Sequence, residues 1–267
     1  MAPQKFLRRL ANKPLAGRGI VVTRPRDQAA GLAALIEGAG GRVFLYPAIE
    51  IEDLPDPAAA LQVLGNLEQF DLAIFVSPTA VRKSFELIKR KPAPWPSGLR
   101  AAAVGQGSRD ELERHGIHGA LAPESGADSE ALLALPELAN VTGKRIAIFR
   151  GEGGRELLGD TLAARGAKVE YAACYRRTRP RIDVAPLLSA WAQGTVHALT
   201  VSSSNGLRNL VALLGESGQA LLDGTPVFVP HRRVAEEARR LGVRMPVLAG
   251  PADAEMMARL VAYFSEP

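Results

Sequence analysis

Two arginines that directly follow apolar, strand-like segments are the first candidates for chemistry in this chain. Arg24 follows the run GIVVT at 19–23, and Arg150 follows the run at 143–149. Each precedes a segment with helical spacing, where free backbone N–H groups and the helix dipole attract anions. Arginine binds planar carboxylates and phosphates through paired hydrogen bonds. We interpret both junctions as anion sites, and the alternative is a surface arginine beside an ordinary strand–helix turn.

The loop after Arg150 strengthens this interpretation. Gly151, Gly153 and Gly154 permit close backbone approach to a ligand, and Arg155 adds a second positive charge. The glycines do not form the G-x-G-x-x-G pattern of a dinucleotide site, and no P-loop lysine follows them.

Hydroxyl side chains end another pair of predicted strands. Ser77-Pro78-Thr79 follows the run at 71–76, and Ser202, Ser203 and Ser204 follow the run at 198–201. We expect them mainly as helix N-caps, although they can also donate to a carboxylate. Neither segment resembles the G-x-S-x-G turn of a serine hydrolase.

Ser108 and the pair His231 and Arg232 begin helices after two further predicted strands. Their position also points them at the carboxyl ends of strands, where ligands of parallel α/β sheets bind. A solvated helix start explains His231 and Arg232 equally well. The histidines have no spacing typical of a metal site, and we predict no metal.

Tyr175 is the candidate proton donor. It directly follows the predicted strand at 168–174 and stands beside Arg176 and Arg177. A phenol is protonated near neutral pH, so it can donate a proton or a hydrogen bond. The alternative is a tyrosine that only packs a hinge. The single cysteine, Cys174, has no partner or base nearby, and we expect a small buried residue in a reducing cytoplasm.

A duplication positions these residues. Residues 20–48 align without a gap on residues 146–174, so that Arg24 matches Arg150. The same offset of 126 positions brings Ser77 onto Ser203. Two similar units usually enclose a cleft, and we expect the matched residues to line it from opposite walls.

Short apolar runs alternate with amphipathic segments along the chain. This alternation is typical of parallel sheets covered by helices on both faces. We predict one helix that begins at Pro25 and continues through 28–38, and another at 128–135. The predicted strands are 19–23, 43–46, 71–76, 99–104, 143–149, 168–174, 198–201 and 225–229. The predicted fold class is α/β, with two interleaved, doubly wound, flavodoxin-like domains joined by a two-segment connector.

Two proline-rich stretches mark the crossings between the domains. Residues 47–57 and 176–186 each follow the second strand of a repeat. We therefore expect a discontinuous first domain made of residues 1–47 and 178–267. The second domain is expected to be continuous, from 52 to 173. The paired connector is expected at 48–51 and 174–177.

The composition favours some classes of ligand and partner over others. A net charge of +5 and a pI near 9.6 favour an anionic ligand, or reflect a solvated basic surface. Only 5% of residues are aromatic and no zinc-finger spacing occurs, so nucleic acid is a poor candidate. No apolar stretch approaches the roughly 20 residues that span a bilayer. The basic N-terminus lacks the apolar core of a secretory signal, and we expect its first dozen residues to be a loosely ordered lead-in.

Taken together, these motifs resemble the uroporphyrinogen-III synthase family. The matching segments are TRP at 23–25, FVSPTAV at 75–81, AVGQGSRDEL at 103–112, DSEALLALPEL at 128–138, GKRIAIFRGEGGRELL at 143–158, RGAKVEYAACYRRTRP at 165–180 and the serines at 200–206. The resemblance implies two α/β domains and a cytoplasmic lyase of haem biosynthesis. Its substrate would be hydroxymethylbilane, a linear tetrapyrrole polycarboxylate that is closed with inversion of the last ring through a spiro intermediate. No cofactor or metal is implied.

The resemblance also implies roles for individual residues. Tyr175 falls where the family has a tyrosine and would be the general acid. The substrate-binding residues would be Thr23, Arg24, Ser77, Thr79, Ser108, Arg150, Gly151, Gly153, Arg155, Ser202, Ser203, Ser204, His231 and Arg232. One departure is Pro230-His231-Arg232-Arg233, where the family often has a Ser or Thr. His231 or Arg232 would replace that hydroxyl.

Two other functions remain alternatives at this point. One is a non-catalytic sensor of a tetrapyrrole or another anion on the same scaffold. The other is a two-domain transferase that acts on a sugar nucleotide. It lacks support, because the sequence shows no convincing diphosphate loop or acidic metal pair. We expect a monomer without nucleic acid or membrane partners, with at most a transient contact to the enzyme that supplies hydroxymethylbilane.

Overall fold

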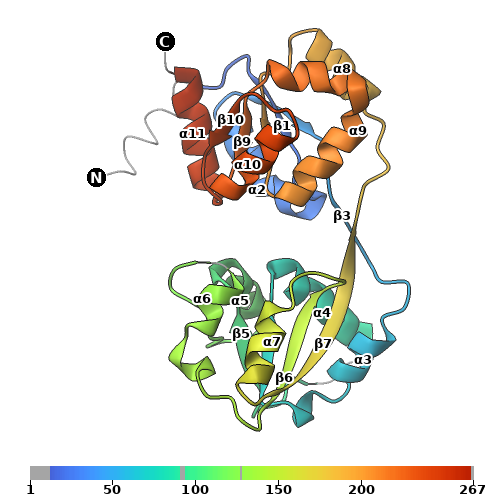
Figure 1. The fold of residues 1–267 in the computed structure, drawn as a ribbon, viewed down its shortest axis with the longest axis vertical. Coiled ribbons are helices and arrows are strands. Elements are labelled where there is room, and N and C mark those ends of the chain that lie inside the picture. Colours follow the sequence, from blue (N-terminus) through green and yellow to red (C-terminus); the bar gives the residue numbers. More distant parts are fainter. Residues whose placement is uncertain (1–12, 91–93, 127, 266–267) are drawn as a thin grey trace. The chain divides into compact units, whose positions relative to one another are not determined.

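A computed structural model describes residues 13–90, 94–126 and 128–265. The predicted lead-in over the first dozen residues lies outside this range. The chain divides into two compact units (Figure 1). Unit 1 combines residues 1–50 with residues 178–267, and unit 2 comprises residues 51–177.

Unit 1 is built on a five-stranded sheet in the order β10-β9-β8-β1-β2. Its strand pairs are parallel. The strands are β1 (Gly19–Val22), β2 (Arg42–Leu45), β8 (Ala198–Thr200), β9 (Val227–Val229) and β10 (Pro246–Leu248). Numbered within the unit, this is the order 2-1-3-4-5 of flavodoxin-like sheets. The predicted interleaving is confirmed, because β1 pairs with β8 across more than half of the chain.

Helices cover both faces of this sheet because successive residues of its inner strands are all buried and point alternately to the two faces. Ile20 and Val22 pack with helices on one side, and Val21 packs with helices on the other. The first group is α2 (Arg26–Gly38) and α11 (Asp253–Ser265), and the second is α8 (Ala185–Ala192), α9 (Ser204–Asp223) and α10 (Arg232–Arg240).

Unit 2 has a second five-stranded sheet, in the order β3-β7-β6-β4-β5. The pairs β7-β6, β6-β4 and β4-β5 are parallel. The strands are β3 (Glu50–Glu52), β4 (Leu72–Phe75), β5 (Arg100–Ala103), β6 (Arg145–Gly151) and β7 (Lys168–Thr178). The central strands β4 and β6 are almost wholly buried apolar runs, which is why they lie between two helical layers.

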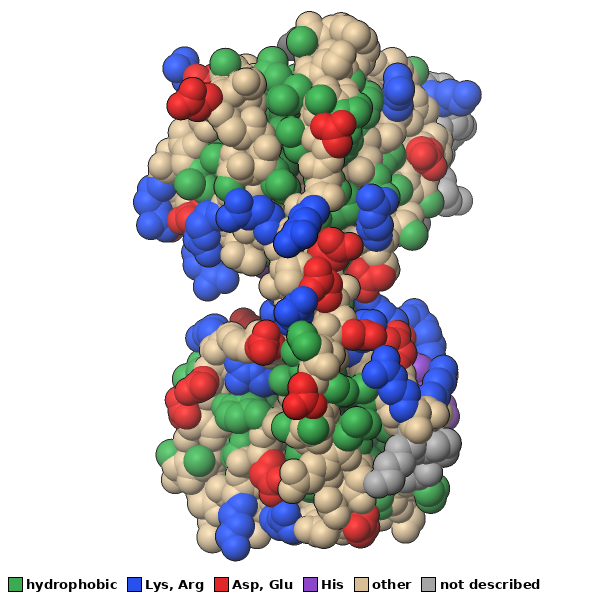
Figure 2. Space-filling model, turned by 90° about the vertical axis from the view of Figure 1, so that its right-hand side faces the viewer, with side chains coloured by type: hydrophobic (Ala, Val, Ile, Leu, Met, Phe, Trp, Pro, Cys, Tyr) green, Lys and Arg blue, Asp and Glu red, His purple; other side chains and the backbone are tan. Residues whose placement is uncertain are grey.

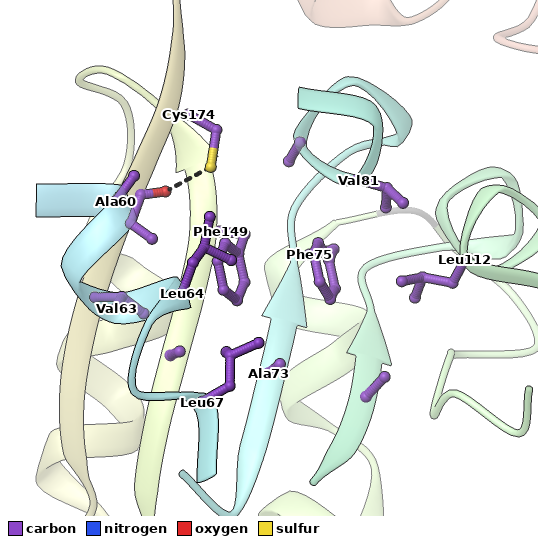
Figure 3. Close-up of a cluster of buried hydrophobic side chains, with 14 of the residues drawn as sticks. Ala60, Val63, Leu64, Leu67, Ala73, Phe75, Val81, Leu112, Phe149 and Cys174 are labelled. Carbon is purple, nitrogen blue, oxygen red and sulfur yellow. Dashed lines mark hydrogen bonds between the residues drawn. The ribbon is translucent and has the colours of Figure 1, made fainter. Parts of the chain in front are cut away.

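Two hydrophobic clusters flank this sheet. On one face Phe75 of β4 and Phe149 of β6 stack at 4.8 Å beneath the helices (Figure 3). The helices of that face are α3 (Ala58–Leu64), α4 (Pro78–Arg90) and α5 (Gln106–Arg114). The opposite face is covered by α6 (Ser129–Leu133) and α7 (Leu157–Ala164), with 3-10 turns at Leu67–Gln69 and Pro136–Leu138 completing the unit.

The structure corrects several element boundaries. Pro25 is the N-cap of α2 and not its first helical residue, because its ψ of 144° is extended. Asp128 caps α6, where its side chain accepts from the backbone N–H of Ala131, as expected for a short polar residue at that position. The proline-rich stretch at 47–57 contains the short strand β3, and β10 was not predicted at all. Both are three-residue edge strands, too short for a period-two pattern to reveal them.

Strand β7 also extends further than predicted. β7 does not end at Cys174 but continues to Thr178, so Tyr175 lies inside a strand. Pairing persists there because the backbone N–H of Glu152 donates to the carbonyl of Tyr175 at 2.7 Å. Among the described residues, no helix combines the length and apolarity needed to cross a membrane.

Candidate active site

The carboxyl ends of β4, β6 and β7 bring several of the predicted residues together within unit 2. Ser77 follows β4, Arg150 and Gly151 end β6, and Tyr175 lies beside them on β7. Within the repeat, β6 is the first strand, β7 the second and β4 the third. Because β7 and β4 lie on opposite sides of β6, the strand order reverses between β6 and β4. Ligands of doubly wound sheets bind at such reversal points.

A β-bulge sets the direction of the Tyr175 side chain. Arg150 pairs with Ala173, whereas the next residue, Gly151, pairs with Tyr175, which leaves Cys174 as the extra residue. In a regular strand, neighbouring side chains point to opposite faces. Here Cys174 and Tyr175 are both buried in the cluster that also holds Phe75 and Phe149. A bulge re-aims a side chain in this way, and such bulges are frequent beside functional sites.

The phenol of Tyr175 is fully buried and has two side-chain partners. A guanidinium nitrogen of Arg177 donates to its oxygen at 2.8 Å. The hydroxyl of Ser77 lies 3.2 Å from the same oxygen, and either group can be the donor of that bond. The hydroxyl of Ser77 also accepts from the backbone N–H of Ala80 at 3.0 Å, so its position is fixed by helix α4. The bulge thus turns the ring into the core of unit 2, and the phenol is buried there.

Gly151 makes room for this ring. A Cβ atom at residue 151 would lie 2.8 Å from two ring carbons of Tyr175. Real Cβ contacts are essentially never that short, so a side chain at Gly151 would displace the ring. This requirement gives Gly151 a role that the sequence alone did not show.

Arg150 is nearly buried and held in place by its own unit. Its guanidinium lies 4.7 Å from the ring centre of Tyr171 and donates to the backbone carbonyl of Gly153. Gly153 and Gly154 adopt positive φ angles of 67° and 102°, which lets the loop fold back over the arginine. The predicted glycine-rich loop thus shapes the surroundings of Arg150.

A pocket of about 170 Å³ opens over this loop. Three arginines line it, together with the Tyr171 ring and the apolar side chains of Val76 just after β4, Ile148 of β6 and Leu158 of α7. The lining residues are Val76, Ser129, Ile148, Arg150, Gly151, Gly153, Gly154, Arg155, Leu158, Tyr171 and Arg177. Such a cluster of guanidinium groups beside backbone of a glycine-rich loop suits a carboxylate.

The positive charge of Arg155 is already partly neutralised by an acidic side chain of the same unit. Its guanidinium pairs with Glu130 at 2.5 Å, and that carboxylate raises the pKa of Arg155. The side chain is largely exposed, so a competing carboxylate in the pocket can replace Glu130 at small cost.

The two strand-end serines of the repeat are helix N-caps, as expected. The Ser203 hydroxyl accepts from the backbone N–H of Gly206 at 3.1 Å at the start of α9, which matches the Ser77 cap of α4. Thr79 and Ser108 are buried near the starts of α4 and α5, and Thr79 also accepts from Arg82. Ser77 in addition contacts the phenol of Tyr175.

The equivalent positions of unit 1 have different partners. The hydroxyl of Thr23 is buried and donates to the carbonyl of Thr200 at 2.8 Å. Arg24 forms an ion pair with Asp253 at the start of α11 and lies near the carbonyl of Pro251. The predicted anion site at Arg24 is thus occupied by the carboxylate of Asp253 from the chain itself.

The remaining predicted residues lie on the surface of unit 1. Ser202, His231 and Arg232 are exposed, and Ser204 is half-buried. Arg232 lines a separate pocket beside the edge strand β10, together with Glu236 and Arg239. Figure 2 shows several basic side chains grouped on one face of unit 1, whereas basic and acidic side chains alternate over the face of unit 2.

The site in unit 2 has no metal-ligand set. Among the described residues, no three His, Cys, Asp or Glu side chains are grouped so that they could hold a metal ion. Cys174 does not supply a nucleophile either, because burial raises the pKa of its thiol to about 12. Its Sγ donates to the carbonyl of Ala172 at 3.4 Å.

Comparison with known proteins decides the family. The model of the family described as "Uroporphyrinogen-III synthase HemD" matches residues 30–259. The chain belongs to the uroporphyrinogen-III synthase family.

Relatives cover nearly the whole chain. The uroporphyrinogen-III synthase of Escherichia coli (strain K12) is 34% identical over 246 residues, which cover 90% of this chain and 98% of that protein. The synthase of Salmonella typhimurium (strain LT2) is 33% identical over 243 residues, with the same coverage. The crystal structure of a mutant uroporphyrinogen III synthase from Thermus thermophilus aligns with a TM-score of 0.60 at 21% identity, covering 92% of this chain and 97% of that one. At that identity, the alignment shows the same fold.

Two residues of the site were missed by the sequence analysis. Arg177 stood beside Tyr175 in the sequence but was not assigned a role, although residues two apart on a strand share a face. Extending β7 past Cys174 would have revealed it. Tyr171, which stacks on Arg150, had no comparable signal, because that contact depends on how β6 and β7 pair.

Proposed function

We propose that this protein is a uroporphyrinogen-III synthase of haem biosynthesis. The match of the family model to residues 30–259 carries this proposal. On this proposal, the enzyme is a cytoplasmic, cofactor-independent lyase that removes water from hydroxymethylbilane and closes the macrocycle with its last ring inverted.

This ring closure depends more on how the enzyme orients the substrate than on how strongly it activates the substrate. Loss of the terminal hydroxyl from an electron-rich pyrrole gives a reactive azafulvene, and unaided closure gives the isomer without inversion. The enzyme must hold the chain so that the substituted carbon of the last ring attacks first and forms the spiro intermediate. Positioning of reacting groups can supply much of the required selectivity.

Tyr175 is the proposed proton donor for the leaving hydroxyl. As the C–O bond breaks, the phenol proton passes to the hydroxyl, which leaves as water. The overall reaction releases water and no net proton, so the proton returns to the phenolate when the last pyrrole carbon loses its hydrogen. The hydrogen bond from Arg177 stabilises the transient negative charge on this oxygen. General-acid assistance of this kind contributes roughly 10²–10⁴ in rate.

The substrate's acetate and propionate groups are the proposed ligands of the strand-end residues. In unit 2, the pocket with Arg150, Arg155 and Arg177 suits one carboxylate. In unit 1, Arg24 serves only if a substrate carboxylate takes over from Asp253. The hydroxyl and backbone groups at Ser202, Ser203 and Ser204 are proposed as further donors. Thr23 joins them only if its hydroxyl gives up the bond to the carbonyl of Thr200.

Isomer analysis tests this function directly. Purified protein is mixed with freshly prepared hydroxymethylbilane, the products are oxidised to porphyrins, and the type III and type I isomers are separated by chromatography. We expect type III to dominate, against almost pure type I in the protein-free control. Tight binding of the bilane with unchanged type I product would instead identify a non-catalytic sensor.

A further inference from the structure

Arg177 stands between the phenol of Tyr175 and the pocket at the end of β6. Its guanidinium donates to the phenol oxygen at 2.8 Å, and its central carbon lies 5.2 Å from the centre of the same ring. Arg177 lines the pocket, whereas Tyr175 does not and is fully buried. We propose that Arg177 is the positioning residue of Tyr175, which holds the phenol oxygen and covers it on the side of the pocket.

The hydrogen-bond inventory supports this assignment. A phenol oxygen carries one hydrogen and accepts through its lone pairs, whereas a guanidinium only donates. Arg177 therefore occupies an acceptor site of Tyr175 and leaves the phenol hydrogen unused by that bond. When the Ser77 hydroxyl donates at its 3.2 Å contact, the phenol hydrogen is free for a third group. Arg177 and Ser77 together thus leave Tyr175 set up as a donor.

Exposure makes Arg177 the movable part of this group. The Tyr175 ring is fixed by Gly151 on one side and by the core cluster around it. The Arg177 side chain, in contrast, belongs to an exposed residue and has the pocket beside it. An anionic group that enters the pocket attracts the guanidinium. The phenol can then be reached only where Arg177 has moved aside.

This inference deepens the proposed function and rests on it, so its first test is kinetic. Arg177→Gln removes the charge but keeps a comparable length. We expect kcat for type III formation to fall roughly tenfold to a hundredfold, as for loss of a charge-assisted hydrogen bond. KM should rise much less, because Arg150 and Arg155 still line the pocket for the carboxylate. Arg177→Lys should recover part of the loss. Arg179→Gln, at an exposed arginine just beyond β7, is the matched control.

A double-mutant cycle separates positioning from a merely structural role. If Arg177 acts through the phenol, Arg177→Gln should have almost no further effect on kcat in a Tyr175→Phe background. Equal losses in both backgrounds, or wild-type kcat in the single variant, would overturn the proposal.

A second test needs neither substrate nor activity. N-Acetylimidazole acetylates tyrosine hydroxyls that reach solvent, and the modified peptides are identified by mass spectrometry. We expect Tyr171, which is 37% exposed, to react in both proteins, and Tyr175 to react only in Arg177→Gln. Equal labelling of Tyr175 in both proteins would refute the covering role. Because this test is independent of catalysis, it also separates a failure of this inference from a failure of the proposed function.

Discussion

The ring of Tyr175 lies directly against the backbone of Gly151, because the bulge in β7 pairs these two residues. We expect Gly151→Ala to push the ring away from Ser77 and Arg177. Overpacking of this kind costs about 1–3 kcal/mol of unfolding free energy, and the displaced phenol should lower kcat as well. Denaturant unfolding and isomer-specific kinetics measure the two effects.

Gly98→Ala is the control for this substitution, since an added Cβ there would meet nothing within 4 Å. Gly98 is in the same unit and should tolerate alanine with little change in either measurement. Wild-type stability and kcat in Gly151→Ala would show that the ring is not confined as described.

Tyr175→Phe removes only the phenol oxygen. The buried ring remains, and its partner Arg177 belongs to an exposed residue that water can solvate, so the loss of stability should be about 0.5–1.5 kcal/mol. If Tyr175 is the general acid, kcat should fall by up to roughly 10²–10⁴. Tyr263→Phe, in helix α11 of unit 1, provides the control because it keeps the same ring. Unchanged turnover in Tyr175→Phe would exclude the acid role.

Arg150→Lys should weaken substrate binding more than it slows the chemistry. A lysine keeps the charge but loses both the planar stacking on Tyr171 and the paired hydrogen bonds that a guanidinium offers a carboxylate. We expect KM to rise about tenfold with a smaller change in kcat. Arg145→Lys is a close match, because Arg145 lies at the other end of β6 and also stacks on an aromatic ring, that of Phe70. Equal KM values for the two variants would argue against a carboxylate site at Arg150.

Cys174 should resist alkylation as long as the protein is folded. Burial raises the pKa of its thiol to about 12, so almost no reactive thiolate is present near pH 8. We expect iodoacetamide to label the folded protein at least about a hundredfold more slowly than the protein unfolded in guanidinium chloride, as followed by mass spectrometry. Rapid labelling of the folded protein would show that this side chain opens to solvent.

Asp71 should make stability depend on acid pH. The backbone N–H of Arg145 and the ammonium group of Lys144 donate to its carboxylate and hold its pKa below the ordinary value of 3.8. A lowered pKa in the folded state means that the ionised carboxylate stabilises the fold above this ordinary value. The stabilisation is lost as the pH falls from about 4 through the folded pKa.

Asp71→Asn therefore should be less stable than the wild type at pH 7 by less than about 1 kcal/mol, because the side chain is partly exposed. Urea unfolding at several pH values should show the two proteins converging at or below pH 3. A constant difference across this range would assign the effect to packing instead of charge.

Local rules were sufficient for part of this molecule. The helix caps at Ser77, Asp128 and Ser203 follow from side chains that bond backbone N–H groups three residues ahead. The interleaved fold was also predictable, because the repeat and its two proline-rich crossings reveal which strands belong together. The glycine-rich loop around Arg150 was recognisable from residue types alone.

Contacts between distant segments could not be predicted in this way. The ion pair of Arg24 with Asp253 joins residues that are 229 positions apart. Nothing in the segment TRP at 23–25 indicates this partner. The extra residue at Cys174 is equally silent in the sequence, since a bulge is a property of two paired strands.

The sequence by itself determined the duplicated α/β architecture, the family and the residue types gathered at the strand ends. Those depend on periodicity, capping and composition, which are short-range properties of the chain. Only the tertiary structure decided that Tyr175 turns inward against Gly151, with Ser77 and Arg177 on its oxygen. The physical reason is that side-chain direction at a bulge, and the partners it meets there, are set by how β6 packs beside β7 and β4.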